Sequence, residues 1–252
     1  MKSKIMNLTI TTIIALLVCL LGRKIPYIIS NESPIWLDRS IGLLVVLLFI
    51  YFTTRNIKKS CRLNKIDFKL GLKCIPISMF LLLGSLILIE CFHYAFPKLI
   101  TCTQGAPDLH NSLESSIAGI LVLTIIGPIT EELICRGYLL TRFSEIVSVR
   151  TAIILQAIFF AMLHGGIIKQ LQTLIVGIIY GYFCYYTNSL IPSLIIHIVN
   201  NTTIAAISLL PISGNYIVFS IIVLLAIVGI YFLWNIFKEF KNKEKVLQKD
   251  LT

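Results

Sequence analysis

The longest uncharged stretch of this 252-residue chain runs from Gln170 to Phe237 and reads QLQTLIVGIIYGYFCYYTNSLIPSLIIHIVNNTTIAAISLLPISGNYIVFSIIVLLAIVGIYFLWNIF. A helix that crosses a membrane needs roughly 20 mostly apolar residues, because the hydrocarbon layer is roughly 30 Å thick. The stretch is long enough for several crossings, and only turn residues around Asn188 and Pro211 divide it. It therefore predicts three apolar helices, at 171–187, 189–210 and 216–237.

Further apolar runs occupy much of the remaining chain, at 5–22, 40–54, 74–97, 115–136 and 151–166. Hydrophobic residues make up 57% of the sequence and charged residues only 13%, which excludes an ordinary soluble domain. The first run resembles a signal peptide, but no A-x-A cleavage site ends it, so we expect it to be retained as a helix. The prediction is an all-α polytopic membrane helix bundle of about eight transmembrane helices, forming a single integral membrane domain over 1–252.

The basic residues lie mostly between and after the apolar runs. The formal net charge is +10, but a nucleic-acid binder gathers its cations on a solvated face, so we exclude nucleic acid as a partner. Under the positive-inside rule, the basic segments 55–73 and 238–249 are cytoplasmic. With eight crossings, both termini of this multi-pass protein of the cell membrane are expected in the cytoplasm, where the basic segments attract membrane lipid.

The cysteines predict neither a disulfide framework nor a zinc knuckle. Their number, seven, is odd, and no C-x-x-C pair occurs. We interpret most of them as small apolar packing residues. They are Cys19, Cys61, Cys74, Cys91, Cys102, Cys135 and Cys184.

Two carboxylates and a guanidinium interrupt the run 115–136, within Gly127-Pro128-Ile129-Thr130-Glu131-Glu132-Leu133-Ile134-Cys135-Arg136-Gly137. Charged groups are costly in a membrane interior, so they indicate function. Glu132 and Arg136 share a helix face and are expected to pair. Glu131 points about 100° away, without that partner, and a carboxylate so placed can act as a base. The alternative, in which Arg136 snorkels to the headgroups, leaves the second Glu unexplained.

Pro128 lies just before this pair of carboxylates. A proline inside a helix is expected to kink it. It also frees backbone groups, which neighbouring helices must then satisfy.

Two histidines lie in apolar runs, each four residues from a partner. Phe160-Ala161-Met162-Leu163-His164 falls in the run 151–166, and His197-Ile198-Val199-Asn200-Asn201 in the run 189–210. A lone intramembrane His is as often a hydrogen-bonded packing residue as a functional one. Together with the Glu pair, the two His residues favour one site of acid, imidazoles and an amide.

Residue counting opposes a simple convergence of these groups. It places Glu131 and His197 nearer the cytoplasmic side, and His164 nearer the outer side if its helix starts at Thr151. Convergence therefore requires tilt, a displaced helix start or a cavity.

These three motifs resemble those of the CPBP family, the intramembrane proteases related to the type II CAAX prenyl endopeptidase and also called the Abi family. The resemblance rests on Glu131-Glu132-x-x-x-Arg136, Phe160-x-x-x-His164 and His197-x-x-x-Asn201, in that order and each on an apolar run. It covers a motif-bearing core at about 115–205. Each motif alone is weak, and the three in order are a strong signal.

The resemblance implies a peptidase with assigned roles for these residues. Glu131 would be the base that activates water, and His164 would help to hold that water. His197 and Asn201 would stabilise the oxyanion. These roles suit peptide hydrolysis, which needs a base for water and donors aimed at developing negative charge. Around them, Glu132, Arg136 and Phe160 are expected to be supporting residues.

A metal is the competing account of the same residues. One carboxylate and two imidazoles, from Glu131, His164 and His197, resemble a zinc ligand set. No H-E-x-x-H occurs, and the three residues come from separate helices. We therefore favour a glutamic-type mechanism with no cofactor, and keep Zn²⁺ as the alternative.

Two other function classes use similar residues. A proton- or ion-coupled transporter also carries intramembrane Glu and His, but it predicts symmetry-related interrupted helices, which we do not find. A non-catalytic role in bacteriocin self-immunity, known among relatives of the family, is the other alternative. For a peptidase, the expected partner is a membrane-associated peptide or protein substrate, such as a pheromone or bacteriocin precursor.

Overall fold

The computed structural model describes residues 35–96, 117–209 and 216–249, and every regular element within these ranges is helical. Five described helices are long and apolar enough to cross a membrane, and two shorter apolar helices cover Ser40–Thr54 and Val149–Met162. The predicted all-α class is confirmed for the described residues, and each apolar run from 40–54 onward overlaps one of these helices. The predicted first helix, 5–22, lies outside the described residues. The five long helices are Phe68–Ala95, Ile117–Ser144, Ile167–Thr187, Ile191–Ser208 and Tyr216–Lys243.

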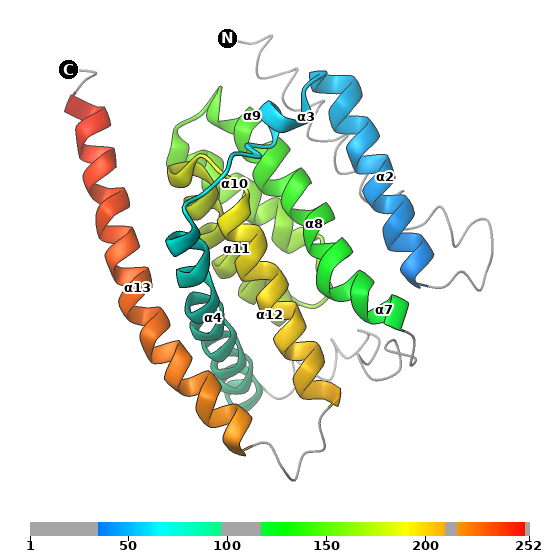
Figure 1. The fold of residues 1–252 in the computed structure, drawn as a ribbon, viewed down its shortest axis with the longest axis vertical. Helices are drawn as coiled ribbons and strands as arrows, with labels where there is room; N and C mark the ends of the chain where they lie inside the picture. Colours follow the sequence, from blue (N-terminus) through cyan, green and yellow to red (C-terminus); the bar gives the residue numbers. More distant parts are fainter. Residues whose placement is uncertain (1–34, 97–116, 210–215, 250–252) are drawn as a thin grey trace.

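The helices form one bundle with α2 (Ile35–Thr54) near one edge and α13 (Tyr216–Lys249) at the other (Figure 1). Helix α13 packs along α4 (Phe68–Ala95). A Cβ atom at Gly229 would overlap the Pro76 carbonyl, so the two backbones meet closely there. This close approach depends on a residue without a side chain.

The motif-bearing helix 117–144 is built from five segments: α7 (Ile117–Leu121), the π-helix η1 (Val122–Ile126), α8 (Gly127–Glu132), the π-helix η2 (Leu133–Leu139) and α9 (Leu140–Ser144). At η1 the Gly127 N–H bonds to the Val122 carbonyl, five residues back. The irregularity expected near Pro128 is therefore a wide π turn directly before α8. Such turns are rare and concentrate at functional sites.

Helices α10 (Val149–Met162) and α11 (Ile167–Thr187) form an antiparallel hairpin. Gly177 and Gly181 of α11 lie against α10, where a Cβ at Gly181 would fall within 2.5 Å of the Gln156 amide nitrogen. That nitrogen donates to the Gly177 carbonyl at 2.8 Å. Small residues four apart thus let the two helices pack closely.

Helix α10 is shorter than the run 151–166 predicted. It starts two residues earlier and ends at Met162, and its 14 residues rise roughly 21 Å, less than the hydrocarbon thickness. His164 consequently lies in the turn to α11 and not on a helix. The turn closes at Gly166, whose φ of 78° is a conformation that suits glycine.

The basic segment 55–73 packs on the end of the bundle. After the short helix α3 (Ile57–Ser60), the Arg62 guanidinium donates to the Thr141 hydroxyl at 3.2 Å. The Ser189 hydroxyl donates to the Asn64 carbonyl at 2.6 Å. These contacts join the segment to α9 and to the turn that precedes α12 (Ile191–Leu209).

The cysteines within the described ranges are free thiols. Cys61, Cys74, Cys135 and Cys184 are buried, and Cys91 is exposed. The remaining two, Cys19 and Cys102, lie outside the described residues.

Candidate active site

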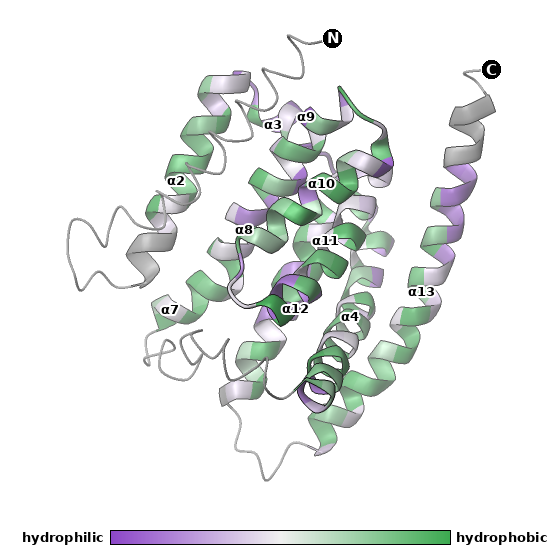
Figure 2. Cartoon of the chain, turned by 180° about the vertical axis from the view of Figure 1, so that it is seen from behind, coloured by the Kyte–Doolittle hydropathy of each residue, from purple (hydrophilic) through white to green (hydrophobic). Residues whose placement is uncertain are grey.

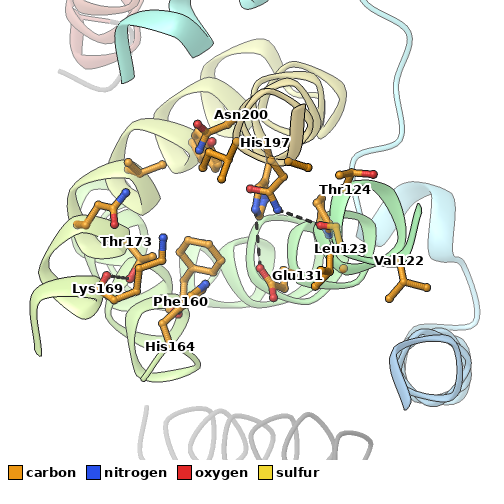
Figure 3. A pocket seen from close by; sticks show the side chains of 18 residues that line it. Val122, Leu123, Thr124, Glu131, Phe160, His164, Lys169, Thr173, His197 and Asn200 are labelled. Carbon is orange, nitrogen blue, oxygen red and sulfur yellow. Dashed lines mark hydrogen bonds and ion pairs between the residues drawn. The ribbon is translucent and has the colours of Figure 1, made fainter. Parts of the chain in front are cut away.

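The four residues assigned to catalysis line one cavity of about 250 Å³ (Figure 3). Glu131 comes from α8, His164 from the turn after α10, and His197 and Asn201 from α12. The convergence that residue counting opposed is produced by the early end of α10 and by the cavity itself. The arrangement joins three parts of the chain that are far apart in sequence.

Glu132 is the centre of a buried network behind the cavity. Its Oε1 accepts from Arg136 Nη1 at 2.8 Å, and both side chains are 0% exposed. The same oxygen lies 3.0 Å from His197 Nδ1. Because a carboxylate oxygen accepts, Nδ1 carries a hydrogen, and the ring turns Nε2 away from Glu132. The predicted pairing of Glu132 with Arg136 is present, and it also orients His197.

The ring of Phe160 contacts Arg136 of this network and also both histidines. The Arg136 guanidinium carbon lies 3.9 Å from the centroid of its ring, within cation–π range. The Phe160 ring meets the rings of His164 and His197 edge to face, at centroid distances of 4.8 Å and 5.9 Å. Phe160 therefore sets the positions of both imidazoles.

The ring of His164 is oriented by a backbone carbonyl four residues earlier in the chain. Its Nδ1 lies 2.9 Å from the Phe160 carbonyl oxygen, which can only accept, so Nδ1 donates. In the neutral ring, Nε2 is then an acceptor. The side chain that carries this nitrogen lines the cavity.

Glu131 faces His197 across a gap. Glu131 Oε2 lies 3.9 Å from His197 Nε2, too far for a direct hydrogen bond, and the two side chains are 13% and 8% exposed. A polar contact of this length leaves space for a bridging water or a substrate atom. Glu131 does not share a helix face with Arg136, as expected from the sequence, but the Lys169 ammonium interacts with it electrostatically.

Asn201 is anchored by the π turn η1. Its Nδ2 donates to the Leu123 carbonyl at 3.1 Å. That carbonyl lacks the usual backbone donors, because the Gly127 N–H bonds to Val122 and Pro128 has no N–H. The Asn201 amide nitrogen keeps a second hydrogen for another acceptor.

Sequence reasoning missed one wall of the cavity. Lys169, Gln172 and Tyr180 of α11 line it, as does Asn200 of α12. Gln172 Oε1, the Tyr180 hydroxyl and Asn200 Oδ1 are buried without a hydrogen-bond partner within the described part of the chain. The signal was available, since Lys169, Gln172, Thr173, Val176 and Tyr180 are spaced to share one face of a helix.

A zinc site would need three or more converging ligands. Among the described residues no group of three or more His, Cys, Asp or Glu side chains is placed to hold a metal ion. In each ring Nδ1 contacts an acceptor, Glu132 for His197 and the Phe160 carbonyl for His164, so Nε2 is the atom through which either ring would bind a metal, as is usual for histidine ligands. Because the candidate ligands among the described residues are not placed as one set, no step below passes through a metal.

Residues 113–203 match the family model described as Rce1-like, type II CAAX prenyl endopeptidase Rce1-like. The matched range contains all three motifs, and with them the four residues that converge on the cavity. The resemblance inferred from the motifs is thereby confirmed. No curated protein and no solved structure matches the chain.

Proposed function

Because residues 113–203 match the Rce1-like family model of type II CAAX prenyl endopeptidases, we propose that this chain is an intramembrane endopeptidase. It hydrolyses a peptide bond in a membrane-associated peptide or protein. The observation that carries the proposal is the gap of 3.9 Å between Glu131 Oε2 and His197 Nε2 on the cavity wall. A carboxylate base and an imidazole that face each other across such a gap can act on one water and one carbonyl.

In the proposed reaction, Glu131 takes a proton from a water held with the help of His164 Nε2. The resulting hydroxide attacks the substrate carbonyl carbon, and the carbonyl oxygen becomes an oxyanion. Glu131 then passes its proton to the leaving nitrogen as the C–N bond breaks. One water is consumed, and a carboxylic acid and an amine are formed, so the carboxylate base is regenerated.

The proposed oxyanion donors are His197 Nε2 and the second hydrogen of Asn201 Nδ2. Since His197 Nδ1 donates to Glu132, donation from Nε2 requires an imidazolium. The Glu132 carboxylate supplies the opposite charge beside this ring, and Arg136 holds that carboxylate. Donors fixed before the reaction avoid the cost of reorienting as charge develops.

The unpartnered oxygens on the α11 and α12 walls support a peptide ligand. A buried acceptor without a donor destabilises the folded state by about 1–3 kcal/mol, so a native protein is expected to supply a partner for it. The backbone N–H groups of an extended substrate are donors of the right kind for Gln172 Oε1 and Asn200 Oδ1. Simple packing of α11 against α12 would leave these atoms unexplained.

The test is comparative peptidomics of cells that carry the wild-type chain or Glu131→Gln. The proposal expects peptides or mature protein ends that appear only with the wild type. Glu145→Gln is the matched control, because Glu145 is an exposed carboxylate paired with Arg142 at 3.2 Å. Identical peptide profiles in wild type and Glu131→Gln would reject the peptidase and favour a transporter or a non-catalytic immunity role.

A further inference from the structure

A second groove lies away from the candidate active site, between α11, the start of α10 and the end of α13. It encloses about 650 Å³. Its lining includes Tyr182 and Tyr186 of α11 and Trp234 and Phe237 of α13. Among the residues that the structure describes, its lining includes basic side chains and no acidic one.

The floor of the groove is a ladder of aromatic rings. The rings of Tyr182 and Tyr186 stack at 5.8 Å with 5° between their planes. The ring of Tyr186 stacks on Phe240 at 5.0 Å and 17°, and Tyr182 contacts Phe237 at 5.5 Å. These contacts link α11 to α13 and provide a fixed apolar surface.

Basic side chains from two helices line the rim of the groove. Lys238 and Lys241 come from α13 and are exposed, and Arg150 comes from the first turn of α10. The N-terminal end of a helix is itself partly positive, so a cation there is unfavourable for the helix and adds to the positive potential. The groove therefore combines an apolar floor with a rim that attracts an anion.

The rim lies at the level expected for lipid phosphates. The uncharged part of α13, residues 216–237, rises roughly 33 Å, about one hydrocarbon thickness, so Lys238 begins the interfacial part. Figure 2 shows this change along α13, from hydrophobic to hydrophilic residues. Trp234, 73% exposed, lies one turn before Lys238, where indole rings favour the interface.

From these observations we propose that the groove binds an anionic phospholipid. Lys238, Lys241 and Arg150 hold the phosphate, and an acyl chain lies along the aromatic floor. Lysines that only snorkel to the surface need no such floor, whereas basic grooves between membrane helices suit anionic headgroups. Free phosphate shares the headgroup chemistry but has no acyl chain to pack on the aromatic rings.

The test uses Trp234 as a reporter inside the groove. The chain has two tryptophans, so Trp36→Phe makes Trp234 the sole indole of the full-length protein. This variant is reconstituted in phosphatidylcholine vesicles that contain equal small fractions of acyl-brominated phosphatidylglycerol or acyl-brominated phosphatidylcholine. We expect the anionic lipid to quench Trp234 at least about twofold more strongly.

Two variants and one competitor decide the interpretation. Lys238→Gln with Lys241→Gln should abolish the preference, whereas Lys65→Gln with Lys69→Gln, exposed lysines that do not line the groove, should retain it. Equal quenching by the two lipids, or equal loss in both double variants, would overturn the proposal. Inorganic phosphate at about 50 mM should leave most of the preference intact, and its loss would identify a phosphate-ion site in place of a lipid site.

Discussion

Asn201 donates its side-chain amide to the Leu123 carbonyl at 3.1 Å, in place of the backbone N–H that Pro128 lacks. The bond fixes which end of the amide is nitrogen, because a carbonyl only accepts. It thus serves two purposes. It satisfies a backbone group freed inside an apolar helix, and it orients the remaining Asn201 hydrogen.

The first prediction concerns Asn201→Ala. An oxyanion donor is worth roughly 3–4 kcal/mol in the transition state, so kcat should fall about 10²–10³-fold with KM nearly unchanged. An interhelical hydrogen bond in a membrane is worth only about 0.6 kcal/mol, which the folded protein should tolerate. The measurement is steady-state cleavage of a peptide found by the peptidomics experiment.

The controls separate catalysis from the anchoring of Leu123. Pro128→Ala supplies an N–H, so in that background Asn201 is no longer needed to satisfy the carbonyl. The same large loss of kcat in both backgrounds supports the oxyanion role, and a loss that vanishes with Pro128→Ala means that Asn201 only anchors the turn. Thr202→Ala, exposed on the same helix, is the neutral comparison, because Asn200 lines the cavity.

The second prediction concerns Glu131→Gln in the purified protein. The amide keeps the shape of the carboxylate and removes the base, so kcat should fall by about 10² or more. Glu145→Gln, at the exposed residue that follows α9, should leave the rate unchanged. Full activity of Glu131→Gln would remove Glu131 from the role of base.

The third prediction concerns the buried pair of Glu132 and Arg136. Arg136→Met leaves the Glu132 carboxylate buried without its guanidinium and should lower the free energy of unfolding by about 3–5 kcal/mol. The double variant Glu132→Gln with Arg136→Met should be less destabilised than the sum of the two single variants. Unfolding in a series of sodium dodecyl sulfate concentrations measures the free energy of unfolding of the two single variants and of the double variant. Additive losses would show that the two side chains do not depend on each other.

The fourth prediction concerns metal. The proposed mechanism uses a carboxylate base and two oxyanion donors and requires no Lewis acid. Cleavage by the purified protein should survive prolonged treatment with a chelator, and the metal content should be well below one ion per chain. Loss of activity on chelation, restored by Zn²⁺, would replace the glutamic mechanism with the metal-dependent one.

The fifth prediction concerns topology and uses the burial of Cys61. Burial raises the pKa of the Cys61 thiol from 9.0 to about 12, so at pH 8 the reactive thiolate is about a thousandfold scarcer than in an ordinary cysteine. Cys61 itself should therefore stay unlabelled on either side of the membrane. Lys65→Cys, at an exposed position of the same segment, is the suitable reporter.

In intact cells, an impermeant maleimide should label Lys65→Cys only after permeabilisation, if the segment 55–73 is cytoplasmic. The exposed Cys91, near the opposite end of α4, should be labelled from outside and serves as the internal control. Cys19→Ser and Cys102→Ser remove the other two candidate thiols. The reverse pattern would invert the topology.

The helical character of the chain and the four residues proposed for catalysis were readable from local sequence. Apolar runs too long for soluble helices imply membrane helices, and Glu131, His164, His197 and Asn201 stand out because polar groups are costly in such runs. Even the irregularity before Glu131 followed from Pro128, which lacks the N–H that a helix requires. Each of these inferences concerns one segment and its own backbone.

Only the tertiary structure decided which helix faces pack against each other. The spacing of Lys169, Gln172 and Tyr180 defines a stripe on α11, but a helical period does not say which other helix that stripe faces. Because α10 ends at Met162, His164 lies in the turn at the cavity. The Leu123 carbonyl accepts a hydrogen bond from Asn201, which lies on a helix that is distant in sequence. These outcomes depend on close packing between segments far apart in the chain, where a carbonyl without a donor or a glycine without a Cβ acquires its partner only once the helices meet.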